Sequence, residues 1–243
     1  MRVDVILSPR YLSEYDLSHN LVVVVDVFRA TSTIITAIHN GARQVVPFMK
    51  TEEVEKKAAE YPADEVLKCG ERKGYKFSGF DLGNSPLKYT RDEIYKKTLL
   101  FTSTNGSQVF KKVTPAGKIL IGGFLNVNNV VDSIVKNKVD CIIACAGNYG
   151  KISIEDSVCA GMILARLQEN GKSIEMSDEA ITSMILYQYF KDDFQSIIRE
   201  SSHGRYLASI GKKEDMIYCL KTNTFNCLPV YNGTSIVNST KEK

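Results

Sequence analysis

Residues 22–35 read VVVVDVFRATSTII, and this stretch decides how the chain folds. Four consecutive valines form a short apolar run between polar segments, which is typical of a strand buried on both faces in a parallel α/β sheet. Asp26 stands where this strand should end, and Arg29 follows it. Residues 31–33 are all Ser or Thr and offer N-caps for a following helix. Because ligands of open α/β sheets bind beyond the carboxyl ends of strands, we predict an anion and metal site at this corner.

The composition is that of an ordinary globular protein. The chain has 243 residues, of which 44% are hydrophobic and 24% are charged, with a net charge of +3. This length can bury a full core, and no linker divides it, so we interpret residues 1–243 as a single domain. The small, scattered charge disfavours both nucleic acid and a membrane surface as partners.

The sequence also constrains the compartment of the protein and the metals that it can bind. No apolar run approaches the ~20 residues of a membrane helix, and the first residues lack a signal-peptide pattern. The six cysteines form no CxxC pair, which disfavours a zinc site. Several cysteines lie in apolar runs, so we expect buried thiols in a reducing cytoplasm.

Apolar periodicity and turn residues divide the chain into alternating strands and helices. We expect strands at residues 3–7, 22–27, 44–48, 65–69, 99–101, 118–121, 141–146, 216–220 and 227–231, and helices at 31–39, 51–61, 108–113, 126–136, 155–169 and 177–190. This alternation predicts a three-layer α/β/α fold with a mostly parallel or mixed central sheet. Residues 22–41 and 99–117 share one pattern, which indicates either two related βαβ halves or the ordinary likeness of such units. The tail from residue 238 should be loose.

Three carboxylates are candidate metal ligands: Asp26, Glu155 and Asp156. Hard oxygen ligands near strand ends suit Mg²⁺, which keeps several waters and uses few carboxylates. Glu155 and Asp156 open a predicted helix, where acidic side chains also complement the helix dipole. Adjacent helical positions point in different directions, so the sequence leaves open which of these two contacts the metal.

Arginines and polar turns are candidate anion-binding groups. Arg29 and Arg72 each present a planar fork of donors that matches phosphate or sulfonate oxygens, although composition alone favours a solvated surface charge for Arg72, since most arginines are exposed. Three loops combine glycine, amides and hydroxyls in the manner of anion-binding turns, or of ordinary turn and capping chemistry. The candidates in them are Asn84 in FDLGNSP, Thr104, Asn105 and Gly106 in TSTNGS, and Asn148 in CAGNYG.

Two further residues complete the candidate set. Glu71 can orient an arginine or bind the metal through water. His203 is the best candidate for proton transfer among the three histidines, although a lone histidine is more often structural. The chain has no GxGxxG and no Walker lysine motif, so nucleotide binding is not indicated.

Four segments in order resemble the motifs of the 2-phosphosulfolactate phosphatase family: DVFRATSTI, GERKGYKFSGFDLGNSP, TSTNG and CAGNYGKISIEDSVCAG. The resemblance runs from about residue 3 to residue 235. It implies a three-layer α/β fold and an acid phosphatase that depends on Mg²⁺. It further implies hydrolysis of 2-phospho-3-sulfolactate to sulfolactate and phosphate in sulfonate and coenzyme M metabolism.

Together, the resemblance and the chemistry of the side chains suggest a role for each group of candidate residues. Catalysis is assigned to Asp26, Arg29, Glu71 and His203. Arg29 and the loops around Asn84 and Asn105 would hold the phosphate, which leaves Arg72 and Lys73 for the sulfonate or carboxylate of the small anionic substrate.

Several alternatives stay open at this stage. A haloacid-dehalogenase-like phosphatase would use Asp26 as nucleophile, but it needs a second Asp at position 28, where Phe stands. A non-catalytic small-anion-binding protein would not need three carboxylates together. Direct attack by water, a covalent intermediate and a homo-oligomer are all compatible with the sequence.

Overall fold

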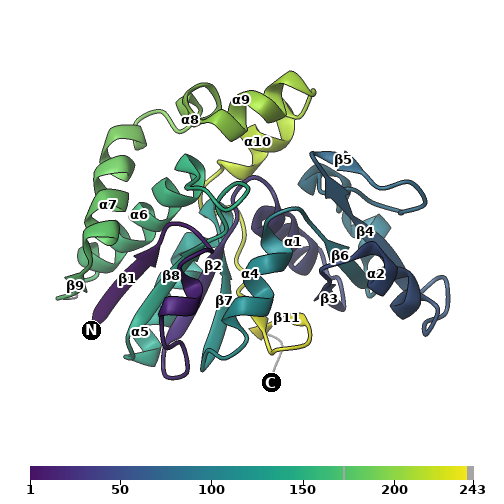
Figure 1. Cartoon of the computed structure of the whole chain (residues 1–243), viewed down its shortest axis with the longest axis horizontal. Helices are drawn as coiled ribbons and strands as arrows, with labels where there is room; N and C mark the ends of the chain where they lie inside the picture. Colours follow the sequence, from purple (N-terminus) through teal and green to yellow (C-terminus); the bar gives the residue numbers. More distant parts are fainter. Residues whose placement is uncertain (172, 240–243) are drawn as a thin grey trace.

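A computed structural model describes residues 1–171 and 173–239 of the chain. Within these residues the central sheet has eleven strands (Figure 1). Their order across the sheet is β5 (Tyr75–Lys76), β4 (Val66–Arg72), β6 (Thr98–Thr102), β3 (Gln44–Pro47), β11 (Ile236–Asn238), β10 (Pro229–Tyr231), β7 (Lys118–Gly122), β2 (Leu21–Val25), β8 (Cys141–Cys145), β1 (Arg2–Ile6) and β9 (Glu175–Met176).

The sheet is mixed, as the sequence predicted. The valine strand β2 lies inside the sheet and pairs in parallel with both β7 and β8, and its four valines are fully buried. β3, β6 and β4 form a second parallel group. The antiparallel hairpin β10–β11 joins the two groups by pairing with β7 on one side and β3 on the other.

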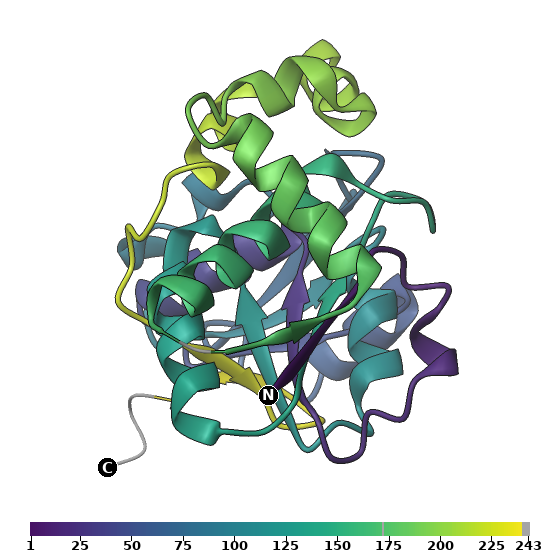
Figure 2. The same ribbon diagram turned by 90° about the vertical axis from the view of Figure 1, so that its left-hand side faces the viewer.

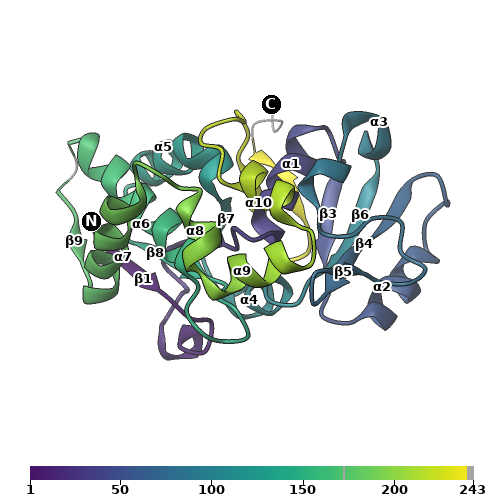
Figure 3. The ribbon, with the colours of Figure 1, turned by 90° about the horizontal axis from the view of Figure 1, so that it is seen from above.

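Helices cover both faces of this sheet. They are α1 (Ala30–His39), α2 (Thr51–Ala58), α3 (Arg91–Ile94), α4 (Gly106–Val113), α5 (Val127–Asn137), α6 (Ile154–Glu169), α7 (Asp178–Phe190), α8 (Ser196–Glu200), α9 (Ser202–Ser209) and α10 (Lys213–Cys219), with 3-10 turns η1 (Leu12–Glu14), η2 (Pro86–Lys88) and η3 (Phe124–Asn126). α5, α6 and α7 share one core with β1, β2 and β8, while α4 and η1 pack on the opposite face of β2 (Figure 3). These layers confirm the α/β/α prediction.

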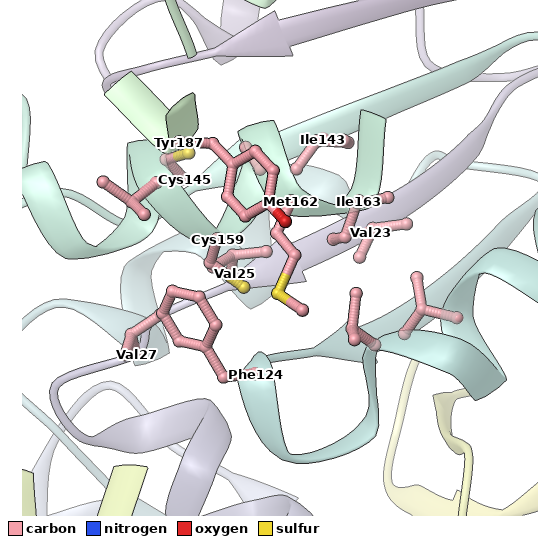
Figure 4. Packing of buried hydrophobic residues seen from close by; sticks show 14 of the residues in the cluster. Val23, Val25, Val27, Phe124, Ile143, Cys145, Cys159, Met162, Ile163 and Tyr187 are labelled. Carbon is pink, nitrogen blue, oxygen red and sulfur yellow. The ribbon is translucent and has the colours of Figure 1, made fainter. Parts of the chain in front are cut away.

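The larger core lies between α6 and the central strands. Figure 4 shows Cys159, Met162 and Ile163 of α6 close to Val23 and Val25 of β2. The pattern follows from the two periodicities, because alternate strand residues face one layer while helix residues three and four apart share a face. This packing fixes the carboxyl end of β2 against the start of α6.

The two βαβ units expected from the sequence are both present. β2–α1–β3 and β6–α4–β7 connect the same two parts of the sheet in opposite directions, because β2 pairs with β7 and β3 pairs with β6. The starts of α1 and α4 therefore come from two different strand ends. A Cβ added to Gly106, at the start of α4, would lie 2.9 Å from the Cβ of Ala30, at the start of α1.

The C-terminal helices α8–α10 lie across the carboxyl ends of the central strands (Figures 1 and 3). The N-terminus lies at the opposite end of the sheet (Figure 2). In the part of the chain that is described, no helix is both long enough and apolar enough to cross a lipid bilayer.

The structure corrects three local predictions. Residues 216–220, predicted as a strand, fall in or directly after α10. α1 is capped by Arg29, whereas Thr31 bonds the backbone of Asp26. The long loop predicted at residues 70–86 holds the end of β4 and the hairpin strand β5. Of the tail expected to be loose, residues 240–243 lie outside the described residues.

Candidate active site

Asp26 lies directly beyond the carboxyl end of β2 and is only 4% exposed. The hydroxyl of Thr31 donates to the Asp26 carbonyl at 2.9 Å and accepts from its N–H at 3.0 Å, which fixes the backbone. Ala30 N–H, at the start of α1, donates to Asp26 Oδ1 at 3.4 Å. A Cβ added to Gly106 would lie 2.9 Å from Asp26 Oδ2, so glycine lets the start of α4 approach the same carboxylate. Asp26 thus lies between two helix N-termini.

The surroundings of Asp26 shift the pKa of its carboxyl group into the neutral range. Burial raises the pKa of Asp26 to about 7, although the charge of His203 and the N–H of Ala30 favour its ionised form. The neighbouring carboxylates Glu71 and Glu155 contribute to the increase. A carboxylate of this kind can exchange a proton or bind a cation near neutral pH.

His203 is held by a buried carboxylate. Its Nδ1 lies 2.8 Å from Glu155 Oε1, and the two side chains are 13% and 1% exposed. Burial lowers the pKa of His203, but the hydrogen bond and charge of Glu155, together with Asp26 and Glu71, outweigh burial and leave the pKa raised. With Nδ1 engaged, Nε2 is the ring nitrogen left for a substrate.

Asp156, which follows Glu155 on α6, bonds the backbone. Its Oδ1 accepts the N–H of Val27 at 2.8 Å, and its Oδ2 accepts the N–H of Gly147 at 3.0 Å. Burial and the charges of Asp26 and Glu155 raise its pKa well above the usual range. Asp156 therefore joins the segments that follow β2 and β8, two neighbouring strands.

Glu71, at the end of β4, organises two turns. Its Oε2 accepts the N–H of Gly74 at 2.6 Å, and its Oε1 accepts the N–H of Thr104 at 3.0 Å. The Lys73 N–H donates to Thr104 Oγ1 at 3.4 Å, and the Tyr206 hydroxyl of α9 donates to the Lys73 carbonyl at 3.0 Å. These bonds hold the β4–β5 turn, the start of α4 and α9 around one space.

Arg29, predicted as an anion clamp, has a carboxylate partner. Its guanidinium forms a buried ion pair with Asp215 of α10, and Nη2 donates to the Gly74 carbonyl at 3.2 Å. The second oxygen of Asp215 accepts the Ser85 hydroxyl at 2.5 Å. Asp215 therefore joins α1, the loop before η2 and α10, and it leaves Arg29 oriented but largely neutralised.

Three asparagines lie around the same space. Asn84 is 5% exposed, and its Oδ1 has no hydrogen-bond partner in the described part of the protein. Asn105 donates from Nδ2 to Asn148 Oδ1 at 3.5 Å and accepts the N–H of Tyr149 at 3.1 Å. The loops predicted as anion-binding turns therefore meet in space.

These residues enclose a narrow hollow of about 30 Å³. The predicted site residues that line it are Asp26, Arg29, Glu71, Lys73, Asn84, Thr104, Asn105, Asn148 and His203. The other predicted residues lie around it. Gly106 packs against Asp26, Glu155 holds His203, and Asp156 bonds the strand ends. Arg72 lines a second space, a groove of about 510 Å³ that shares Lys73, Thr104, Asn105 and Tyr149 with the hollow.

The three predicted metal ligands, Asp26, Glu155 and Asp156, have different surroundings in this geometry. Within residues 1–171 and 173–239, no group of three His, Cys, Asp or Glu side chains is arranged to hold a metal ion. Asp26 and the unpartnered Oδ1 of Asn84 nevertheless offer hard oxygen donors in one hollow. Mg²⁺ commonly uses one or two protein oxygens and completes its shell with water and substrate oxygens. An ion of this kind would need only one or two of the oxygen donors that line the hollow.

Sequence comparisons identify the relatives of this chain. The profile of 2-phosphosulpholactate phosphatase matches residues 6–234. The chain belongs to the 2-phosphosulfolactate phosphatase family. A relative from Clostridium acetobutylicum is 38% identical over 98% of this chain and 100% of its own length. Relatives from Clostridium botulinum (strain Alaska E43 / Type E3) and Thermotoga petrophila are 37% and 38% identical, over 98% and 97% of this chain and 99% and 98% of their own lengths. All three are named "Probable 2-phosphosulfolactate phosphatase".

Sequence reasoning did not single out four residues that line or support the hollow and the groove: Asp215, Tyr206, Arg10 and Lys112. The signal for Asp215 was the acidic pair Glu214–Asp215 after two lysines, a pattern that also suits the first turn of a helix. Tyr206 lies three residues after His203, on the same face of a helix. Arg10 and Lys112 stand in segments with no local motif.

Proposed function

We propose that this chain hydrolyses 2-phospho-3-sulfolactate to 3-sulfolactate and inorganic phosphate, and is therefore a phosphoric monoester hydrolase. One observation carries the proposal: buried Asp26 and the Glu155-held His203 line one hollow at the starts of two helices. Phosphate monoesters hydrolyse extremely slowly in water, so an enzyme must neutralise the charge of the transferring group and supply a proton. The family relatives, which carry this activity in their names, support the substrate assignment.

The helix starts supply the first part of the chemistry. The helix dipoles at the N-termini of α1 and α4 favour a phosphoryl group in the hollow. Asn105 lines the same space, and the second hydrogen of its Nδ2 can be donated to a phosphoryl oxygen. Arg29, neutralised by Asp215, orients these groups more than it adds net charge.

His203 supplies the proton. In its protonated form it donates to Glu155 through Nδ1, and Nε2–H would protonate the leaving alkoxide as the P–O bond breaks. Position 28 is a buried Phe, so the second aspartate of an aspartyl-phosphate mechanism is missing. We therefore propose direct attack of water on phosphorus, with one water proton passing to Asp26 or to solvent.

We also propose that the reaction depends on Mg²⁺. We assign Asp26 and Asn84 as its ligands, because both line the hollow and Asn84 Oδ1 has no hydrogen-bond partner in the described residues. A bound ion would neutralise phosphoryl oxygens and lower the pKa of a bound water. Phosphate release should stop with a chelator and return on adding Mg²⁺. Full activity in the presence of chelator would contradict the metal assignment without affecting the assignment of His203.

The central test is phosphate release from 2-phospho-3-sulfolactate by the purified protein. We expect turnover by the wild type and almost none by Asp26→Asn, with matching circular dichroism spectra. A wild-type protein that binds the substrate but releases no phosphate would support the alternative of a non-catalytic anion-binding protein.

The family resemblance alone leads us to propose that the product supplies coenzyme M synthesis in the cytoplasm. Deletion of the gene should then lead to accumulation of phosphosulfolactate and to loss of coenzyme M. Unchanged amounts of both metabolites would contradict this cellular role.

A further inference from the structure

The groove beside the hollow is strongly basic. Four of the side chains that line it are cations, Arg10, Arg72, Lys73 and Lys112, and no Asp or Glu lines it. In the described part of the chain, none of the four forms an ion pair. A concave surface with several unpaired charges of one sign concentrates ions of the opposite sign.

The cations are positioned by the fold and come from separate segments. The Lys112 ammonium of α4 donates to the Pro9 carbonyl at 2.6 Å. Arg10 packs against Gly150, where an added Cβ would lie 2.6 Å from its Nε. Ser8 Oγ donates to the Gly150 carbonyl at 2.8 Å and fixes the two loops together. Positioned donors lose less conformational entropy on binding than free ones.

Arg72 is positioned in a different way. Its guanidinium carbon lies 5.7 Å from the centroid of the Phe77 ring, within range of a cation–π interaction. Lys73 follows it at a positive φ of 53°, and its N–H and carbonyl bond Thr104 and Tyr206. The β4–β5 turn therefore presents two cations from a backbone that is fixed on both sides.

The sizes and shared walls of the hollow and the groove suggest how a substrate would lie across both. The hollow of about 30 Å³ has room for little more than a reacting group, whereas the adjoining groove has about 510 Å³. Because four residues line both spaces, a ligand with its phosphoryl group in the hollow would extend its other end along the groove.

We infer that this basic groove binds the non-reacting anionic end of the substrate, and that Arg10 and Lys112 are specificity-determining residues. The inference rests on the proposed function for the reacting end. The groups that bind in the groove are strongly acidic, namely sulfonate or carboxylate, and are attached to the phosphorylated carbon chain. Four cations outnumber the two anionic groups of phosphosulfolactate beyond its phosphate, so the groove can hold both at once.

The test compares kcat/KM for 2-phospho-3-sulfolactate with kcat/KM for ethyl phosphate. We expect the ratio to fall at least tenfold in Arg10→Gln and Lys112→Gln, and further in the double variant. The matched control is Lys111→Gln, because Lys111 is the neighbouring exposed lysine of α4 and lines a different groove. An unchanged ratio in the double variant, with a normal melting temperature, would overturn the inference.

A binding measurement separates this inference from the proposed reaction. Calorimetry with 3-sulfolactate needs no turnover, and the double variant should bind it at least tenfold more weakly than the wild type does. This arm decides the inference even if the wild type releases no phosphate. Calorimetry with inorganic sulfate is the second control. If the double variant loses sulfate and sulfolactate binding equally while the kcat/KM ratio stays constant, the groove is a free-anion site and the inference is wrong.

Discussion

The hollow and the groove share four lining residues but differ in charge and in burial. At the hollow, the carboxylates of Asp26, Glu71 and Glu155 lie around His203. Each of these three residues is at most 7% exposed. The groove presents four exposed cations without a carboxylate. Buried charges cost folding free energy, whereas exposed ones cost little and are screened by salt. Under the proposed function, the hollow would perform the chemistry, at a cost in stability, and the groove would select the ligand.

The largest expected effect is that of Asp26→Asn on the hollow. The substitution removes the one carboxylate at the starts of both helices, and we expect kcat for phosphosulfolactate to fall by about 10³-fold or more. The steady-state rate of phosphate release measures this. Asp132→Asn, at an exposed position on α5, is the control and should retain wild-type turnover.

The same variant should be more stable than the wild type at alkaline pH. Burial raises the pKa of Asp26 from 3.8 to about 7, so the folded state disfavours the ionised form. Its destabilising effect is absent below about pH 4, grows between pH 4 and 7, and is complete above pH 7. Chemical denaturation at pH 8 should therefore show Asp26→Asn stabilised by roughly 2–4 kcal/mol, with no gain near pH 4. Equal stability at both pH values would mean that Asp26 is not buried as a charge.

The second effect concerns the proton carried by His203. His203→Gln should lower kcat by about 10²–10⁴-fold. Glu155→Gln keeps the imidazole but removes the hydrogen-bonded charge that raises its pKa. Since the protonated ring is the active form, kcat should fall as the pH rises through this pKa, and in Glu155→Gln that fall should begin at lower pH. A pH–rate profile unchanged by Glu155→Gln would show that His203 is not the acid.

The third effect compares a buried ion pair with an exposed one. Asp215→Asn leaves the 3%-exposed Arg29 without its partner, and we expect the free energy of unfolding to fall by about 3–5 kcal/mol. Asp193→Asn breaks the surface pair with Arg199, whose side chain is 68% exposed, and should cost less than about 1 kcal/mol. Urea denaturation of both variants measures the difference. Similar costs would mean that the Arg29 pair is no better protected from water than the surface pair.

The sequence predicted the centre of the site because the signals there are local. Asp26 stands four residues before Ala30, the first residue of α1, in one short motif, so the strand end, carboxylate and helix start could be inferred together. The hollow also gathers Glu71, Asn84 and Asn105, which lie in the segments that resemble the family motifs.

The partners of these residues could not be predicted in the same way. Asp215 is 186 residues from Arg29 along the chain, and an ion pair over that distance leaves no local pattern. Residues 216–220 were assigned to a strand because a short apolar run, MIYCL, does not distinguish a strand from one face of a helix. The four cations of the groove come from three separate segments, around Arg10, Arg72–Lys73 and Lys112, and only the fold brings these segments together.

The smallest expected effect is that of salt, and it distinguishes the two regions without any mutation. The Debye length falls from about 10 Å at 0.1 M to about 3 Å at 1 M ionic strength, so exposed charges lose most of their long-range attraction while buried ones are screened much less. If the groove binds the second anion, KM for phosphosulfolactate should rise severalfold over this range, with kcat nearly constant. Ethyl phosphate, which has no second anion, should show a weaker dependence of KM on salt.

Two controls make this last prediction decisive. The Arg10→Gln, Lys112→Gln double variant should lose most of the salt dependence, because half of the exposed cations of the groove are gone. Sodium chloride and sodium glutamate should act alike if screening, rather than chloride binding, is the cause. A fall in kcat with salt at constant KM would place the salt-sensitive charges in the hollow. Because its carboxylates are buried, that result would contradict the division between a buried reacting region and an exposed selecting region.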